Sequence, residues 1–370
     1  MTDTAWLHFG PGNFFKALPA AVAQCPIVTV TRGVPSAEPY MLTTLKANGT
    51  KERRTVSSIA EALNLDRDAE RIRELLSSPK LQAVSFTVTE KGYLPSQMWA
   101  FLRDALSKRT APLALVSMDN LSANGDKLRE VIGIDRFAYP CTMVDKITPY
   151  SADPRLIEAE ETQYLVIEDD FPNGRPPISG PGVYFTDRAT VEKCERMKLC
   201  ALLNPLHTAL AVFGCLLGYV KISDEMDDPL LVKLLQRLGY EEALPTVDSP
   251  GIIDPAGFLS EVLTVRLPNP FLPDTPQRIA CDTSQKLPIR FGETVRRAKT
   301  PLVAVPLVFA GWLRYRDGVD DFGNTFELSP DPAFSQAAID YLPLKAETAQ
   351  YLAQMRRGIG AVRRTLEETL

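Results

Sequence analysis

The sequence predicts an α/β protein of two domains, a first domain of alternating strands and helices and a second domain that is mostly α-helical. Two observations carry this prediction. Up to about residue 190, short apolar or β-branched segments alternate with amphipathic stretches, as in a parallel sheet with crossover helices. From Val191 onward the pattern becomes helical, with proline-rich breaks such as 266–270 between helices. We therefore predict domains at 1–190 and 191–370, which a chain of 370 residues accommodates.

The composition argues against several classes of function. Apolar residues make up 45% and charged residues 24%, which is ordinary for a soluble globular protein. A net charge of −5 offers no basic surface, so no nucleic-acid partner is expected. Six cysteines without a CxxC pair and only two histidines predict no metal site and reduced thiols in a cytoplasmic protein. The N-terminus lacks a basic leader, and the apolar run at 209–220 is too short for a bilayer, so no membrane partner is expected.

The first segments justify the prediction of a nucleotide-binding sheet. A buried strand at 6–9 runs into a Gly-x-Gly turn and a helical stretch at 17–23, and a second strand follows at 26–31. This order opens a dinucleotide-binding, Rossmann-type fold, because small residues let the backbone approach a pyrophosphate. The third glycine of the usual fingerprint is absent, so a simple tight turn is the alternative. The candidate cofactor-binding residues of the turn are Gly10, Gly12, Asn13 and Phe14.

The end of the second strand leaves the cofactor open. An acidic residue there would bind the adenosine ribose and favour NAD. The chain has Thr31-Arg32-Gly33 instead. Arg32 could face the 2′-phosphate of NADP or be solvated, so we expect NAD and keep NADP possible.

The remaining elements follow from periodicity and turn residues. We predict a hairpin at 41–56 around Asn48-Gly49, strands at 84–89, 113–118, 138–145 and 163–168, and helices at 57–76, 96–108 and 126–132. Beyond the boundary we predict helices at 191–220, 228–238, 255–265, 288–298, 301–315 and 345–366.

Polar side chains follow three of the predicted strands. Glu90, Asn120 and Asp145 lie at or just after predicted strand ends. Ligands of open α/β sheets bind at that edge, although loop entrances are polar in any protein. We interpret the three residues as candidate substrate-binding groups.

The stretch 191–220 has a charged first half and an apolar second half. Lys198, Asn204 and His207 lie between them. A lysine, an amide and a histidine at the start of an apolar helix could form a proton-transfer site. The alternative is a buried helix with a satisfied histidine.

Together these residues resemble the long-chain polyol and uronate dehydrogenases of the mannitol dehydrogenase family. The matching stretches are LHFGPGNFFKA at 7–17, SFTVTEKGY at 85–93, SMDNLSANG at 117–125, MVDKITP at 143–149, VIEDDFPNGRP at 166–176, ERMKLCALLNPLHTALAVFG at 195–214 and RIACDTSQKLP at 278–288. The resemblance implies a Rossmann-type domain plus a helical domain. It also implies metal-free, NAD(P)-dependent interconversion of a secondary alcohol and a ketone in a sugar alcohol or sugar acid.

The resemblance assigns roles by position. Lys198 would be the general base in oxidation and the general acid in reduction, with Asn204 and His207 holding the reacting oxygen. A lysine needs a lowered pKa for this task, which burial or nearby cations supply and a neighbouring carboxylate opposes. The implied substrate-binding residues are Asn120, Asp145, Glu90, Glu195, Arg278 and Lys286.

One departure from the family concerns geometry. The family usually has one residue fewer between the lysine and the asparagine. On a straight helix Lys198 and His207 would point about 180° apart and lie roughly 13 Å apart along the axis. Because Pro205 disfavours helical backbone before it, we predict a break or a π-bulge between Leu199 and Pro205.

The substrate remains a choice within the family. Arg278 and Lys286 could bind a carboxylate, so we expect a fructuronate reductase-like enzyme that acts between a keto-uronate and an aldonate. The alternatives are a neutral polyol dehydrogenase of mannitol or arabinitol type and a catalytically silent nucleotide-binding protein. We expect a monomer or a small homo-oligomer.

Overall fold

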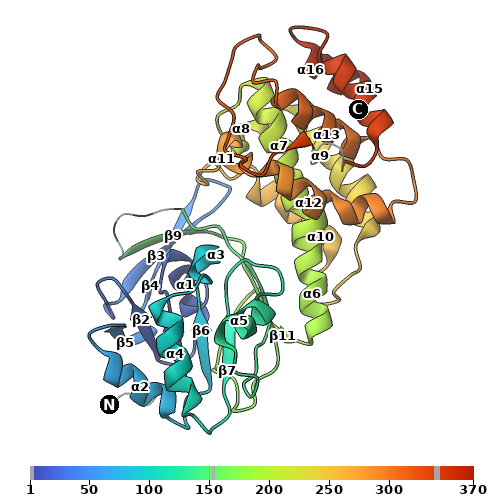
Figure 1. Ribbon diagram of the computed structural model, residues 1–370. Coiled ribbons are helices and arrows are strands. Elements are labelled where there is room, and N and C mark those ends of the chain that lie inside the picture. The colour runs from blue at the N-terminus through green and yellow to red at the C-terminus, as the bar shows by residue number, and fades with distance from the viewer. Residues whose placement is uncertain (1–3, 150, 152, 154, 337–341) are drawn as a thin grey trace. The chain divides into compact units, whose positions relative to one another are not determined.

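The computed structural model describes residues 4–149, 151, 153, 155–336 and 342–370. Their contacts divide the chain into two compact units. The first unit comprises Met1–Lys46 and Thr50–Glu192, and the second comprises Ala47–Gly49 and Lys193–Leu370. Figure 1 labels the helices and strands of both units.

The first unit is built on a five-stranded sheet of order β5-β2-β1-β6-β7, in which every pairing is parallel. Its strands are β1 Trp6–Phe9, β2 Ile27–Thr31, β5 Ile59–Asn64, β6 Ala83–Phe86 and β7 Ala114–Ser117. In chain order this is 3-2-1-4-5, the Rossmann arrangement, with the order reversing between β1 and β6. The predicted Rossmann-type fold is confirmed.

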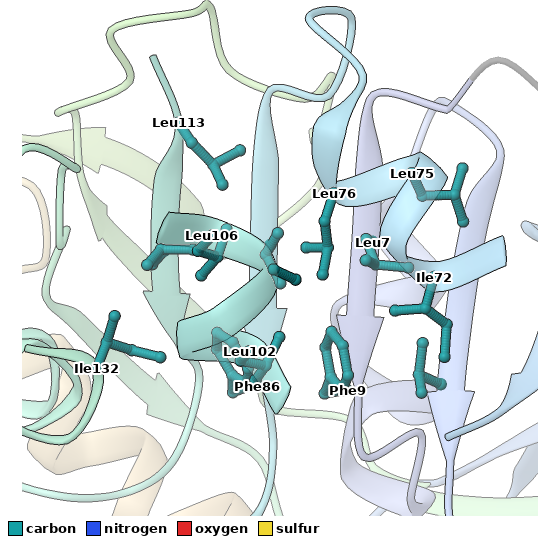
Figure 2. Packing of buried hydrophobic residues seen from close by; sticks show 14 of the residues in the cluster. Leu7, Phe9, Ile72, Leu75, Leu76, Phe86, Leu102, Leu106, Leu113 and Ile132 are labelled. Atoms are coloured by element: carbon teal, nitrogen blue, oxygen red, sulfur yellow. The ribbon is translucent and has the colours of Figure 1, made fainter. Parts of the chain in front are cut away.

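Helices cover one face of this sheet. They are α2 Ala69–Ser77, α4 Gln97–Ser107 and α5 Asn124–Ile132. Figure 2 shows their apolar side chains spread over the sheet, with Ile72 near Leu7 and Leu102 near Phe86, and Ile132 belongs to the same cluster. Full burial of each such side chain contributes roughly 1.5–3 kcal/mol. This core holds the strand ends in fixed positions.

The opposite face is covered by α1 Asn13–Ala17 and by two small sheets. One small sheet has the order β4-β3-β9 and the other the order β11-β10-β8. Their strands are β3 Tyr40–Leu45, β4 Lys51–Val56, β9 Leu156–Glu160, β8 Thr142–Asp145, β10 Tyr164–Glu168 and β11 Val183–Thr186. The predicted hairpin at 41–56 is confirmed as β3 and β4, whereas β9 and β11 were not predicted.

The predicted helix at 57–76 is wrong in its first part. Residues 59–64 form β5, and α2 begins only at Ala69. Ile59 and Leu63 are both buried and lie four residues apart. A spacing of four satisfies the helical period and the strand period alike, so only pairing with β2 decides between them.

The third polar strand end belongs to a different sheet from the other two. Asp145 ends β8, but β8 pairs antiparallel with β10 in a separate sheet, where Asp145 lies opposite Tyr164. β8 nevertheless begins beside the end of β7, where Thr142 Oγ1 donates to the carbonyl of Ser117 over 2.7 Å, and Val144, the neighbour of Asp145, lines a pocket together with Glu90 and Asn120.

The second unit is helical, as predicted. After α6 Arg188–Met197, within which the chain passes between the units, its α-helices are α7 Asn204–Leu217, α8 Ile222–Glu225, α9 Pro229–Gln236, α10 Pro255–Glu261, α11 Pro276–Ile279, α12 Thr283–Arg297, α13 Ala304–Tyr315, α15 Lys345–Met355 and α16 Ala361–Thr369. The predicted helix at 345–366 is two helices, because Gly358 and Gly360 have positive φ between them.

Helix α7 is the buried core of this unit. Its residues from Thr208 to Leu217 are all buried, and it packs against α11, α12 and α13. In the described part of the chain, one helical stretch, Arg188–Leu217, is long and apolar enough to cross a membrane. Its most apolar window is 78% buried within the structure, and the core helix of a folded domain passes the same test.

Candidate active site

The glycine turn after β1 has a geometry that only glycine permits at its first position. Gly10 has a φ of +88°, and a Cβ there would lie 2.2 Å from the carbonyl oxygen of Thr87. Gly12 has only the carbonyl oxygen of Gly10, at 4.0 Å, near the position of an added Cβ. Open space beside Gly12 fits the close approach of a ligand to the backbone.

The buried side chain of His8 helps to hold this turn in place through Thr87. His8 stacks on Phe15 with ring centroids 3.5 Å apart. Its Nδ1 lies 2.7 Å from Ser85 Oγ, and its Nε2 lies 3.0 Å from Thr87 Oγ1. Thr87 Oγ1 in turn donates to the carbonyl of Gly10 over 2.5 Å. Burial lowers the pKa of His8 to about 3, so the imidazole is neutral. This neutral ring positions the hydroxyl of Thr87, which in turn fixes the carbonyl of Gly10 in the turn.

Two pockets flank the turn at the carboxyl edge of the parallel sheet. One, of about 440 Å³, is lined by residues that include Gly10, Arg32 and Lys91. The other, of about 390 Å³, has Gly12, Asn13, Phe14, Glu90 and Asn120 among its lining residues. Thr87 lines both pockets. All five predicted cofactor residues thus lie at two adjoining pockets, as an extended dinucleotide requires, together with two substrate candidates. Asp145 is not among the lining residues given for either pocket.

Asp119, which the sequence did not single out, fixes the loop between the two pockets. Its carboxylate accepts hydrogen bonds from the backbone N–H of Val88 (3.1 Å), the N–H of Thr89 (2.9 Å) and the hydroxyl of Tyr93 (2.9 Å). Burial raises the pKa of Asp119, and these hydrogen bonds oppose the rise. Val88 and Thr89 lead into the short helix α3 Thr89–Gly92, which carries Glu90, so Asp119 positions a predicted site residue.

In the second unit, the predicted interruption of the helix is confirmed. Residues Lys198–Leu202 form a π-helix, in which the N–H of Leu203 donates to the carbonyl of Lys198 over 3.2 Å. Leu203 leaves helical geometry with φ −121° and ψ −63°, and α7 begins at Asn204. A π-turn absorbs one residue, which reduces the angular offset between Lys198 and His207 from about 180° to roughly 80°. Lys198 is only 3% exposed.

His207 lies among charged side chains. Its Nε2 is 3.5 Å from Asp274 Oδ2, which is long for a hydrogen bond, and Asp274 also pairs with Arg278. Burial lowers the pKa of His207 to about 4, while Asp274 opposes this and Arg290 adds to it. The contact is therefore one between a neutral imidazole and a carboxylate. Asp274 links the predicted catalytic residue His207 to the predicted substrate residue Arg278.

Lys286 and Glu195 have different surroundings. Lys286 Nζ donates to the backbone carbonyls of Ile279, over 3.3 Å, and Cys281, at the end of α11. Glu195 lies partly buried on α6, one turn before Lys198.

Arg290 was also not predicted. Its Nη1 donates to Thr208 Oγ1 over 2.5 Å and to the carbonyl of Asn204 over 3.4 Å. Its spacing of four residues from Lys286 on a helix could have pointed to it.

Known families match nearly the whole chain. The mannitol dehydrogenase Rossmann domain matches residues 4–180, and the mannitol dehydrogenase C-terminal domain matches residues 190–367. The chain belongs to the mannitol dehydrogenase family. It is therefore an enzyme, a dehydrogenase that uses a nicotinamide dinucleotide, and the pockets beside Gly10 and Gly12 fit that cofactor.

Individual members of the mannitol dehydrogenase family are similar over most of their length. A D-mannonate oxidoreductase of Thermotoga maritima is 41% identical, over 88% of this chain and 79% of the relative. A polyol:NADP oxidoreductase of Gluconobacter oxydans is 27% identical, over 90% of this chain and 84% of the relative. The structure of Pseudomonas fluorescens mannitol 2-dehydrogenase with NAD and D-mannitol is 25% identical, has a TM-score of 0.76, and is matched over 98% of this chain and 94% of that one.

Proposed function

We propose that this enzyme is a fructuronate reductase-like dehydrogenase that interconverts a keto-uronate and an aldonate, with Lys198 as the general acid and base. The observation that carries the proposal is the π-helix at Lys198–Leu202. Without it, the extra residue before Asn204 would turn Lys198 away from His207. With it, Lys198 and His207 come within roughly 80° of each other around the helix.

The roles of the side chains follow from their chemistry. A bound nicotinamide supplies the hydride in reduction and accepts it in oxidation. Lys198 donates a proton to the substrate oxygen in reduction and removes it in oxidation. Asn204 and neutral His207 donate hydrogen bonds to the same oxygen and stabilise its developing negative charge. Because the pKa of His207 is lowered to about 4, the imidazole stays a neutral donor throughout the physiological range.

The charge around these groups supports an acidic substrate. Arg266, Arg278 and Arg290 all act on His207 electrostatically, and Asp274 is the acidic group that opposes them there. An excess of positive charge attracts a carboxylate and offers no advantage to a neutral polyol. The similarity to a D-mannonate oxidoreductase supports the same class, because mannonate is an aldonate.

A neutral polyol is the second candidate substrate. Arg278 pairs with Asp274, and Lys286 binds backbone carbonyls, so both predicted substrate cations have partners within the protein. The similarity to a polyol:NADP oxidoreductase and to a mannitol 2-dehydrogenase also supports this candidate.

The test is turnover followed by nicotinamide absorbance. Purified protein is assayed with NADH or NADPH and with D-fructuronate, D-tagaturonate, D-fructose or D-fructose 6-phosphate. We expect turnover on a keto-uronate, and we expect Lys198→Ala to lower it by a factor on the order of 10³ or more, with cofactor binding unchanged. Lys193→Ala, which removes a charge from a partly exposed residue of α6, serves as the control.

Two results would contradict the proposal. Faster turnover of D-fructose than of any keto-uronate would favour the neutral polyol dehydrogenase. Cofactor binding without turnover on any of the four substrates would favour a catalytically silent nucleotide-binding protein.

A further inference from the structure

We propose that Arg290 binds the carboxylate of the substrate and determines the preference for a uronate over a neutral sugar. This inference rests on the proposed function and deepens it, because it names the residue that recognises the acidic group.

Arg290 lies beside the turn that carries His207. From α12, its Nη1 donates to Thr208 Oγ1 over 2.5 Å and to the carbonyl of Asn204 over 3.4 Å. These contacts use a single nitrogen of the guanidinium. Within the described ranges, Nε and Nη2 make no hydrogen bond, and the residue is partly exposed. Nη1 of the guanidinium is thus fixed by the protein, and the N–H groups of Nε and Nη2 remain available to a ligand.

The neighbouring cations are already engaged. Arg278 pairs with Asp274, and Lys286 donates to two backbone carbonyls at the end of α11. Arg290 has no carboxylate partner in the part of the chain that the structure describes. Burial lowers its pKa to about 10, so the guanidinium remains charged at neutral pH. Among these three cations, Arg278 has a carboxylate partner and Lys286 has two carbonyl partners, whereas Arg290 has neither.

A purely structural role would not explain that charge. Arg290 contacts the first turn of α7, a helix of 14 residues, and positive charge near a helix N-terminus is unfavourable. A neutral amide could donate the same hydrogen bond to Thr208. An anion beside Arg290 would remove this penalty, because it is favoured both by the guanidinium and by the helix N-terminus. Arginine also matches a carboxylate in shape, since two of its N–H groups can bind both oxygens.

The experiment compares an acidic and a neutral substrate. Arg290→Met is assayed with D-fructuronate and with D-fructose, and competitive inhibition by D-mannonate and by D-mannitol is measured in parallel. A charge-assisted hydrogen-bonded pair contributes about 1.5–3 kcal/mol. We therefore expect kcat/KM for D-fructuronate and affinity for D-mannonate to fall by roughly 10- to 150-fold. The values for the two neutral compounds should change about threefold or less, and Arg290→Lys should be intermediate with both acids.

The matched control is Arg296→Met, which removes the same charge from α12 at a side chain that is 70% exposed. Arg296→Met should leave unchanged both the ratio of kcat/KM for D-fructuronate to that for D-fructose and the ratio of the inhibition constants of D-mannonate and D-mannitol. Fluorescence titration with NADH, which tests the first unit, and the melting temperature verify that each variant is folded. If Arg290→Met does not fold, Arg290→Gln, which keeps a neutral donor for Thr208, supports the same comparison.

The outcomes separate this inference from the proposed function. Equal losses for acidic and neutral compounds would overturn it, because Arg290 would then act only by positioning α7. Unchanged kinetics would overturn it as well. Wild-type enzyme that prefers D-fructose would refute the proposed function. In that event, D-mannonate inhibition that does not depend on Arg290 would refute this inference separately.

Discussion

Arg32 directly follows β2, at the position where an acidic side chain would bind the ribose of NAD. It lines the first pocket together with Lys91, and no Asp or Glu is among the residues that line this pocket. Two cations and no carboxylate favour a phosphate group at that end of the dinucleotide. NAD is expected for the family, and this pocket also allows NADP.

Arg32→Asp should shift the cofactor preference toward NADH. Its carboxylate would repel a 2′-phosphate and accept a hydrogen bond from a ribose hydroxyl. We expect the ratio of kcat/KM for NADH to that for NADPH to rise about tenfold or more. Arg53→Asp, the same change at an exposed position of β4, is the control and should leave the ratio as it is. A ratio that Arg32→Asp also leaves unchanged would show that Arg32 is merely solvated.

The π-helix at Lys198–Leu202 decides how two helical segments are joined. Five residues lie between Lys198 and Asn204, and the π-turn accommodates them with backbone hydrogen bonds between residues five positions apart, such as that from the N–H of Leu203 to the carbonyl of Lys198. The π-turn holds one residue more than a regular α-helical turn and adds no rotation about the helix axis. The segments before and after it therefore keep the relative orientation that they would have in a regular helix one residue shorter.

Deletion of Cys200 should therefore preserve activity. The shortened segment can form regular α-helical bonds, and Lys198 should keep its direction relative to His207. We expect turnover of the preferred substrate within about tenfold of wild type and equal or higher stability, measured by steady-state kinetics and thermal unfolding. Insertion of one alanine after Cys200 is the matched control. It should rotate Lys198 by roughly 100° and abolish turnover. A folded deletion variant without activity would show that the π-turn itself is required.

Each unit of the protein contains one of the two histidines, of which His8 is fully buried and His207 largely buried, and both are neutral. His8 has a pKa lowered to about 3 and His207 a pKa lowered to about 4, in both by burial. Their unfolded-state pKa is 6.5. The stability that depends on the neutral imidazoles is fully present above pH 6.5. It is lost as the pH falls toward 4 for His207 and toward 3 for His8, because in this range the histidines of the unfolded chain bind protons and those of the folded chain do not.

Stability should fall on acidification for this reason in both units. Between pH 7.5 and pH 5.0, each histidine should lower the free energy of unfolding by about 2 kcal/mol. Carboxyl groups with raised pKa, such as Asp119, act in the opposite direction, so differences between variants are the useful measure. In urea unfolding, His8→Gln should reduce the acid loss of the first unit and leave that of the second unchanged. An acid loss that neither His8→Gln nor His207→Gln reduces would contradict the assignment.

The sequence by itself determined the family, the Rossmann-type sheet, the helical second half and the interruption before Asn204. These features depend on local rules. Gly10 is required where φ is positive and Thr87 is near, and Pro205 disfavours regular helix at the residue before it. The roles of Lys198, Asn204 and His207 remain predictions that the proposed assays test.

Only the tertiary structure decided the rest. Residues 59–64 became a strand through pairing with β2, and Asp145 came to end a strand of a separate sheet through the pairing of β8 with β10. Asp274 and Arg290 reached His207 from segments more than 60 residues away, and Arg290 contacts Thr208 across 82 residues of sequence. Pairing and charge contacts between distant segments depend on how the elements pack, and no local pattern of residues specifies that packing.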